Sequence, residues 1–81
     1  MKIRVRLFAV AREAAGRDSL ELDLPEGATI ALLRSQLGTE IPQLSGLVAQ
    51  MMFAIDTKYA DDATPIPPHA DVACIPPVSG G

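Results

Sequence analysis

Strict alternation of apolar and charged residues at the start of the chain constrains its fold more than any other feature. In KIRVRLF, residues 2–8, every second residue from Ile3 is apolar, whereas the charged residues and Phe8 fall on the opposite face. A period of two predicts a strand with one buried face. SLELDL, residues 19–24, places three leucines on one face in the same way. The two segments predict an antiparallel hairpin, joined through a helical turn in AREAAG that Gly16 ends.

One amphipathic helix is predicted after this hairpin. Pro25, Glu26 and Gly27 break the second strand, and Thr29 is a suitable N-cap for IALLRSQL, residues 30–37. Three apolar residues of this segment recur at i, i+3 and i+7 and form one stripe: Ile30, Leu33 and Leu37. We expect the helix to end at Gly38.

The second half of the chain predicts two further strands. The segment 41–50 is ambiguous, because Pro42 can open a short helix that Gly46 weakens. MMFAI, residues 51–55, predicts a strand that is followed by a turn near DTKY. A proline-rich loop then leads to DVACI, residues 71–75, which predicts the last strand.

The predicted order is therefore strand, strand, helix, strand, strand. A helix between two hairpins needs a sheet to lie on, and such a mixed sheet commonly places its first and last strands side by side and parallel in the middle. This α+β arrangement is the β-grasp, or ubiquitin-like, fold, with a mixed sheet packed on one main helix. We expect one β-grasp domain over residues 1–76 and an extended C-terminal tail over residues 77–81.

Length, charge and composition exclude several classes of protein. With 81 residues, the chain has room for one domain. A net charge of -3 and the lack of a basic stripe with interleaved aromatics predict no binding to nucleic acid. Arg4 and Arg6 interrupt the first apolar run, and no segment approaches the roughly 20 apolar residues of a membrane span. We therefore expect a cytoplasmic protein that does not bind membranes.

The tail IPPVSGG points to chemistry at the C-terminus. Pro76 and Pro77 have no amide hydrogens and favour an extended exit from the last strand. Gly80 and Gly81 would form a tip without side chains, which can enter a narrow channel and present a carboxylate. Adenylation would make that carboxylate an electrophile for an amine or a sulfur donor. The alternative is a frayed terminus without function.

Both ends of the chain resemble one family. The ending CIPPVSGG after the strand DVA, and the opening LFAVAREAAG, resemble the corresponding segments of molybdopterin synthase small subunits, and the length is similar too. The chain departs from this family in two turns. It has Ile55-Asp56 where the family often has Val-Asn, and His69-Ala70 where the family often has Gly-Asp.

The resemblance implies a mechanism. A ubiquitin-activating-type enzyme would adenylate Gly81 with ATP, and a sulfurtransferase would supply sulfur for a C-terminal thiocarboxylate. The tail would insert into the large synthase subunit and donate sulfur to cyclic pyranopterin monophosphate, which forms the dithiolene of molybdopterin. The inserted residues would be Pro76, Pro77, Val78, Ser79 and Gly80. The family further implies a heterotetramer of two small and two large subunits, catalytic groups on the large subunit, and no cofactor bound to the small one.

Three apolar residues are candidates for partner binding. Phe8 alternates with the buried set of the first strand, and Ile75 lies opposite Cys74 in the last strand. If these strands are neighbours, both side chains share the outer surface of the sheet, and Tyr59 can join them. The resemblance implies that this patch meets the activating enzyme and the large subunit. The alternative is that a helix or loop covers it.

Four other features have simpler explanations. Cys74 shares a face with Val72, so we expect a buried thiol rather than a sulfur carrier, and one cysteine cannot by itself form a disulfide or a metal site. His69 lacks neighbouring ligands and is expected in an exposed turn. Asp61 and Asp62 lack the spacing of a calcium loop and are expected in a solvated turn. For the adjacent pair Arg12-Glu13, a surface ion pair and a partner contact both remain open.

Three other functions share parts of this pattern. A carrier for another pathway, such as thiamine thiazole synthesis, has the same fold and the same final glycines. A protein modifier would use the activated Gly81 to form isopeptide bonds with lysines. A ubiquitin-like binding module would have an idle tail.

Overall fold

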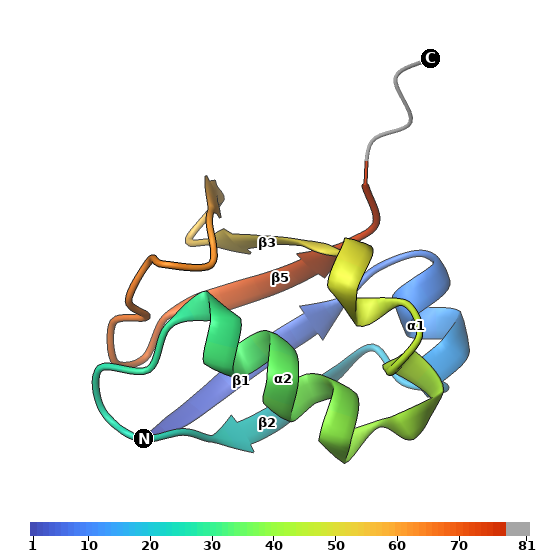
Figure 1. Ribbon diagram of the computed structural model, residues 1–81, viewed down its shortest axis with the longest axis horizontal. Coiled ribbons are helices and arrows are strands. Elements are labelled where there is room, and N and C mark those ends of the chain that lie inside the picture. The colour runs from blue at the N-terminus through green and yellow to red at the C-terminus, as the bar shows by residue number, and fades with distance from the viewer. Residues whose placement is uncertain (78–81) are drawn as a thin grey trace.

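The computed structural model describes residues 1–77. Their secondary structure confirms the predicted succession of strands around one main helix (Figure 1). In chain order, the elements are β1 (Lys2–Leu7), α1 (Val10–Ala15), β2 (Ser19–Asp23), α2 (Ile30–Glu40), the 3-10 helices η1 (Pro42–Leu44) and η2 (Val48–Gln50), β3 (Met52–Ile55), β4 (Lys58–Ala60) and β5 (Asp71–Ile75).

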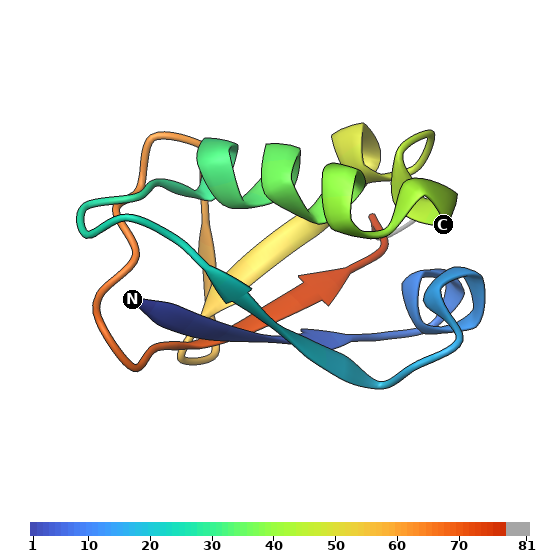
Figure 2. The same cartoon turned by 90° about the horizontal axis from the view of Figure 1, so that it is seen from below.

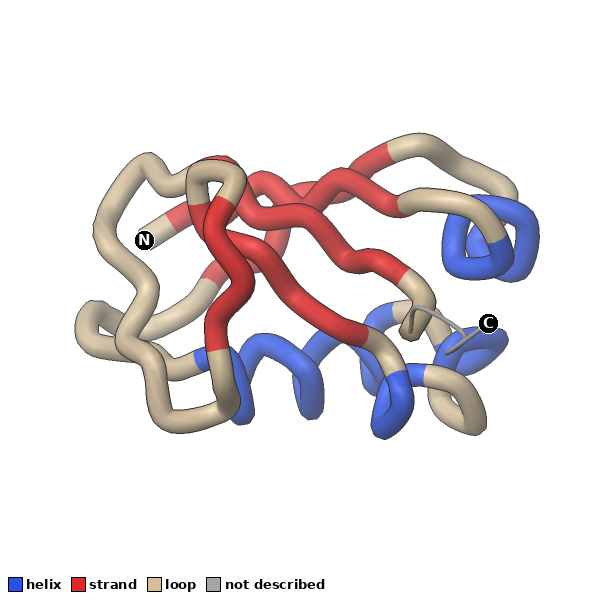
Figure 3. Tube along the Cα trace, turned by 90° about the horizontal axis from the view of Figure 1, so that it is seen from above, coloured by secondary structure: helices blue, strands red, loops and turns tan. Residues whose placement is uncertain are grey.

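The strands form one mixed sheet in the order β2-β1-β5-β3-β4. The first and last strands, β1 and β5, are parallel neighbours in its centre, whereas the other pairs are antiparallel. α2 lies across one face of this sheet, and the other face is not covered by a helix (Figures 2 and 3). The β-grasp prediction is confirmed. The division between a domain at 1–76 and a tail at 77–81 stays a prediction.

The core fills the space between α2 and the sheet. The apolar stripe predicted for the helix is fully buried, and so are the alternate apolar residues of β1. Thr29 caps α2 as predicted, because its Oγ1 accepts a hydrogen bond from the amide of Leu32 at 3.4 Å. The residues that form this layer include Ile3, Val5, Leu7, Leu22, Ile30, Leu33, Leu37, Phe53, Val72 and Cys74.

The expected end of the helix at Gly38 is wrong, because α2 continues to Glu40. A Cβ atom at Gly38 would lie 3.3 Å from Cγ1 of Val48 in η2. The glycine therefore permits close packing of η2 on the helix rather than ending it. The ambiguous segment after α2 forms the two 3-10 turns, the first of them with Pro42 at its start.

The sequence interpretation also missed the short strand β4. Asp56 and Thr57 both have positive φ, 48° and 74°, and connect β3 to β4 in a two-residue hairpin. Asp56 stabilises this turn, because its Oδ1 accepts a hydrogen bond from the amide of Asp71 at 2.9 Å and its own amide donates to the Asp71 carbonyl at 2.8 Å. One of the two departures from the family pattern thus ties the hairpin to the start of β5.

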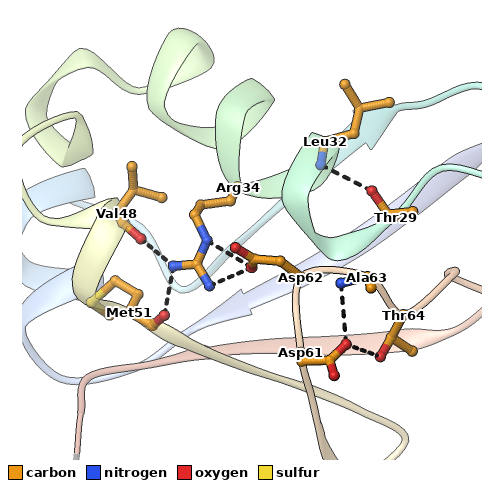
Figure 4. A network of polar contacts seen from close by, with 9 residues as sticks. All are labelled: Thr29, Leu32, Arg34, Val48, Met51, Asp61, Asp62, Ala63 and Thr64. Atoms are coloured by element: carbon orange, nitrogen blue, oxygen red, sulfur yellow. Dashed lines mark hydrogen bonds and ion pairs between the residues drawn. The ribbon is translucent and has the colours of Figure 1, made fainter.

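Arg34 connects the helix layer to the far edge of the sheet (Figure 4). Its Nη1 donates to the carbonyls of Val48 and Met51 at 2.6 and 2.7 Å, while Nε and Nη2 donate to Asp62 Oδ1 at 3.1 and 2.9 Å. Its guanidinium also lies 4.9 Å from the ring centroid of Phe53. One side chain therefore joins α2, η2, β3 and the loop after β4.

The two aspartates expected in a solvated turn are exposed, but both are bonded. Asp62 pairs with Arg34 at 2.9 Å. Asp61 closes its own turn, since its Oδ1 accepts from the amide of Ala63 at 3.1 Å and from the hydroxyl of Thr64 at 2.9 Å. Over residues 1–77, no helix has the length and apolar character needed to span a membrane.

Candidate functional site

The tail begins at the centre of the sheet. Because β1 and β5 are parallel, their carboxyl ends lie at the same edge, and Phe8 follows one while Pro76 follows the other. Pro76 is half-buried and Pro77 is exposed, at the point where the chain leaves the body (Figure 1). Four predicted tail residues lie outside the described residues: Val78, Ser79, Gly80 and Gly81.

Phe8 lies just beyond the strand in which the alternation placed it. Its amide donates to the Cys74 carbonyl at 3.2 Å, and its carbonyl accepts from the Ala11 amide at 3.1 Å, so it connects β5 to the start of α1. The next residue, Ala9, has a φ of 51° and turns the chain away from the sheet. The Phe8 side chain is 39% exposed, as expected for a residue on the outer face.

A row of paired residues crosses the uncovered face of the sheet. Arg6 of β1 pairs with Ala73 of β5, Ala73 with Ala54 of β3, and Ala54 with Tyr59 of β4. Two small side chains therefore stand between two long ones. Because alanine leaves the space above it empty, this row forms a hollow that has the alanines as its floor.

The hollow has a volume of about 410 Å³ and brings all three predicted partner-binding residues together. Phe8, Tyr59 and Ile75 line it, with Pro76 at the start of the tail. Tyr59 is 61% exposed, so neither a helix nor a loop covers it. The hollow and the residues around it are called the docking face below.

The sequence interpretation missed the polar group in the docking face. Arg6 Nε donates to Asp71 Oδ1 at 3.0 Å, and Arg6 Nη2 donates to Asp71 Oδ2 at 2.8 Å. The same guanidinium lies 5.4 Å from the ring centroid of Phe8. Both side chains are about half exposed and line the hollow. The sequence pattern could not predict this pair, because Arg6 and Asp71 are 65 residues apart in the chain.

Met52 was missed as well. It is the cross-strand neighbour of Ile75 and is 37% exposed, so it extends the apolar surface toward η2. Its position in MMFAI carried a usable signal, because alternation places it opposite Phe53, which is buried.

Cys74 faces the core, as predicted from its alternation with Val72. Burial raises the pKa of its thiol to about 11, and the positive charge of Arg34 acts in the opposite direction. The neutral thiol therefore prevails at neutral pH, which disfavours a nucleophilic role.

Two other predicted positions lie away from the docking face. His69 is exposed in the turn before β5, with a φ of 63°. Arg12 Nε lies 4.0 Å from Asp18 Oδ1, so its surface ion pair forms with this residue rather than with Glu13. Within the described part of the chain, no group of three His, Cys, Asp or Glu residues is placed to hold a metal ion.

The family model described as ThiS family matches residues 5–81 of the chain. Among curated relatives, the chain is similar to the molybdopterin synthase sulfur carrier subunit of Arabidopsis thaliana, with 33% identity over 81 residues that cover 100% of this chain and 84% of that protein. It is 34% identical over 84 residues to the subunit of the same name from Dictyostelium discoideum, covering 99% and 96% of the two chains.

Two solved structures share the fold of this chain. SAMP1 from Haloferax volcanii superposes with a TM-score of 0.88 at 24% identity and covers 100% of both chains. The complex of subunits 1 and 2 of molybdopterin-converting factor from Helicobacter pylori contains a chain that superposes with a TM-score of 0.71 at 22% identity, again over 100% of both chains. At these identities the likeness concerns the fold.

Proposed function

The chain belongs to the ThiS family, and on that premise we propose that it is the sulfur carrier subunit of a molybdopterin synthase. Relatives of that name match it at 33 and 34% identity over almost its whole length. The observation that carries the proposal is the position of β5. This central strand leads directly into Pro76 and Pro77, beside an apolar docking face that nothing in residues 1–77 covers.

The proposed chemistry takes place at Gly81. Its carboxylate attacks the α-phosphate of ATP on an activating enzyme, which releases pyrophosphate and leaves an acyl-adenylate. A persulfide on a sulfurtransferase then attacks the acyl carbon and displaces AMP. A second thiol cleaves the S–S bond of the resulting acyl disulfide, which leaves the thiocarboxylate on Gly81 and a disulfide on the donor side. In the large subunit, the thiocarboxylate donates its sulfur to cyclic pyranopterin monophosphate, and water restores the carboxylate. The dithiolene has two sulfur atoms, so two such transfers complete it.

The proposal divides the chemistry between the carrier and its partner proteins. The tail supplies the reacting group, whereas the general acids, the general bases and the substrate pocket belong to the large subunit. ATP is consumed by the activating enzyme, and the carrier holds no cofactor of its own. The synthase is proposed to act in the cytoplasm as a heterotetramer of two carriers and two large subunits.

The docking face gives the carrier a means of meeting its partners. Phe8, Tyr59 and Ile75 line the same hollow as Pro76, so a protein that binds them is positioned to receive the tail. The activating enzyme and the large subunit would use the same face in turn, because both must reach Gly81. A complex of subunits 1 and 2 exists for the H. pylori converting factor, which supports the large subunit as a partner.

Reconstitution tests the proposal. The full chain, thiocarboxylated at Gly81, is mixed with the large subunit from the same organism and with cyclic pyranopterin monophosphate. We expect molybdopterin to form and the mass of the carrier to return to that of the carboxylate. Formation of no product, with a large subunit that forms molybdopterin with a thiocarboxylated carrier from another organism, would contradict the proposal.

A protein modifier is the second candidate function, because SAMP1 of H. volcanii, whose name denotes a small archaeal modifier protein, shares the fold with a TM-score of 0.88. Intact masses from the native cell separate the two candidates. A carrier shows replacement of one terminal oxygen by sulfur, whereas a modifier appears in larger conjugates linked through lysines. A carrier for thiamine thiazole synthesis would also gain sulfur, but it would not form molybdopterin with the large subunit.

A further inference from the structure

The ion pair between Arg6 and Asp71 occupies only one edge of the guanidinium. Asp71 accepts from Nε and Nη2, the side-on edge, at 3.0 and 2.8 Å. A guanidinium has five N–H donors, and within residues 1–77 the hydrogen bonds of Arg6 use two of them. The end-on edge, formed by Nη1 and the outer N–H of Nη2, remains available. This edge has the fork geometry that accepts a carboxylate through two parallel hydrogen bonds.

Arg6 is also held in place. Asp71 fixes its side-on edge, and the Phe8 ring lies 5.4 Å from its Cζ atom. At 46% exposure, the side chain stands at the wall of the hollow rather than in open solvent. A docked protein would therefore remove water from its remaining N–H groups. Buried donors without an acceptor disfavour binding, so a cognate partner has to supply one.

The position of Arg6 in its strand distinguishes it from the other cations on the same face. Lys2 and Arg4 have acidic cross-strand neighbours in β2, namely Asp23 and Glu21. Arg6 instead faces Ser19, which is neutral. Only Arg6 of these three cations lines the hollow with the alanine floor.

We propose that Arg6 is a specificity-determining residue of the docking face. The partner that docks there inserts an apolar side chain above Ala54 and Ala73 and places a carboxylate against the end-on edge of Arg6. This inference rests on the proposed function, because it names the chemistry by which the large subunit recognises the carrier. Asp71 acts as a positioning residue, since it holds the guanidinium at the wall of the hollow.

Binding measurements with matched variants test this inference. The dissociation constant for the large subunit from the same organism is measured by calorimetry for the wild-type chain, Arg6→Met and Arg4→Met. Both variants lose one positive charge from the same strand, but only Arg6 lines the hollow. We expect Arg6→Met to weaken binding by about thirty-fold or more, and Arg4→Met by no more than about three-fold. Equal effects of the two variants would overturn the inference.

A double variant excludes a simpler explanation. Arg6→Met alone leaves Asp71 unpaired, and this by itself could disfavour docking. In Arg6→Met combined with Asp71→Asn, no unpaired charge remains, and we expect binding to stay weak because the partner's carboxylate still lacks its donor. Recovery to wild-type affinity would overturn the inference. Circular dichroism and thermal melting verify that each variant is folded.

Arg6→Lys gives an independent readout. Lysine keeps the charge but cannot form bidentate hydrogen bonds with Asp71 and with a partner carboxylate at the same time. We therefore expect about ten-fold weaker binding, with little recovery at low salt. Wild-type affinity for Arg6→Lys would mean that charge alone matters, and the proposed carboxylate contact would be wrong. The wild-type carrier tests the proposed function separately. If it binds the large subunit and forms molybdopterin, the proposed function is supported regardless of the results for the Arg6 variants.

Discussion

The two faces of the sheet differ in how completely their side chains are packed. Toward α2, the central strands present residues such as Val5, Val72 and Cys74, which are 0% exposed. Toward the other side, the same strands present Arg6, Ala73 and Ile75, with a hollow where the helix face has packed side chains. One face is filled with packed side chains, and the other keeps a hollow that we propose is filled by a partner.

This difference teaches that a single alternating strand can serve folding and recognition at once. Successive residues of a strand point to opposite faces, so Leu7 is buried and Phe8 is exposed although they are adjacent in the chain. Substitutions on the two faces should therefore affect different measurements.

The largest expected change in stability comes from the helix face. Leu7 is 2% exposed, and Leu7→Ala would leave a cavity in the core. We expect a loss of about 2–5 kcal/mol in the free energy of unfolding. Denaturant titration measures this loss, and binding of the folded fraction to the large subunit should change little. A loss below about 1 kcal/mol would mean that the core tolerates the cavity and that the contrast between the faces is overstated.

Substitution of Arg34 should cause the next largest loss of stability, because its side chain joins the helix layer to the sheet. Arg34→Met removes two hydrogen bonds to part-buried carbonyls and leaves that of Met51 without its side-chain donor, whereas the Val48 carbonyl keeps the Met51 amide at 3.2 Å. We expect a cost of about 2 kcal/mol in the free energy of unfolding. Asp62→Asn is the matched control. Its side chain is 58% exposed, so removing this charge should cost less than about 1 kcal/mol. If both variants have the same stability, the carbonyl contacts contribute nothing.

Phe8 tests the uncovered face. Phe8→Ala should weaken binding of the large subunit by about ten-fold or more, because an apolar side chain buried at an interface contributes roughly 1.5–3 kcal/mol. Stability should fall much less than for Leu7→Ala, since Phe8 is 39% exposed. Calorimetry and denaturant titration measure the two quantities. A variant that unfolds as readily as Leu7→Ala and binds normally when folded would place Phe8 in the core and the docking face elsewhere.

Cys74 gives a pH dependence of stability that is absent at neutral pH and is confined to alkaline solution. Burial raises the pKa of its thiol from 9.0 to about 11, so the folded state favours the neutral form. The thiol of the unfolded chain ionises from about pH 9 upward, and stability present below that pH is lost as the pH rises toward 11. Wild type should therefore lose more free energy of unfolding over this range than Cys74→Ala. If the free energy of unfolding fell equally with pH in the two proteins, the burial argument would be contradicted.

Cys74→Ser tests whether Cys74 has a structural role rather than a chemical one. A hydroxyl in this apolar layer should cost about 1 kcal/mol or more. Sulfur transfer by the chemically prepared thiocarboxylate should survive the substitution. Loss of transfer in a folded protein would return Cys74 as a candidate sulfur carrier.

Much of the fold could be predicted from local pattern. Alternation in β1 and β2 and the stripe of α2 predicted which of their residues are buried. The parallel pairing of β1 with β5 was expected only because such mixed sheets commonly have it, since pattern alone does not fix the strand order. Gly38 was misjudged because a glycine that ends a helix and one that admits a close neighbour look alike in sequence. Its neighbour Val48 becomes visible only in three dimensions.

The docking face could be predicted only in part. Phe8 and Ile75 were identified because strand period alone assigns a face to each of them. The hollow above Ala54 and Ala73 depends on the register of β3 against β5, and the bond of Arg6 to Asp71 joins residues 65 positions apart. Neither register nor long-range pairing is encoded in a local pattern, so both had to come from the structure.

The central claim is that the C-terminal glycine carries the reacting group while the rest of the chain serves as its handle. The most direct measurement is molybdopterin formation by the full chain and by a variant that lacks Gly81, each treated with the activating enzyme, ATP and a sulfur donor before the large subunit is added. We predict that the full chain gains sulfur and forms molybdopterin, whereas the variant forms none although its stability lies within about 0.5 kcal/mol of the wild type. Appreciable molybdopterin formation by the variant without Gly81 would contradict the account.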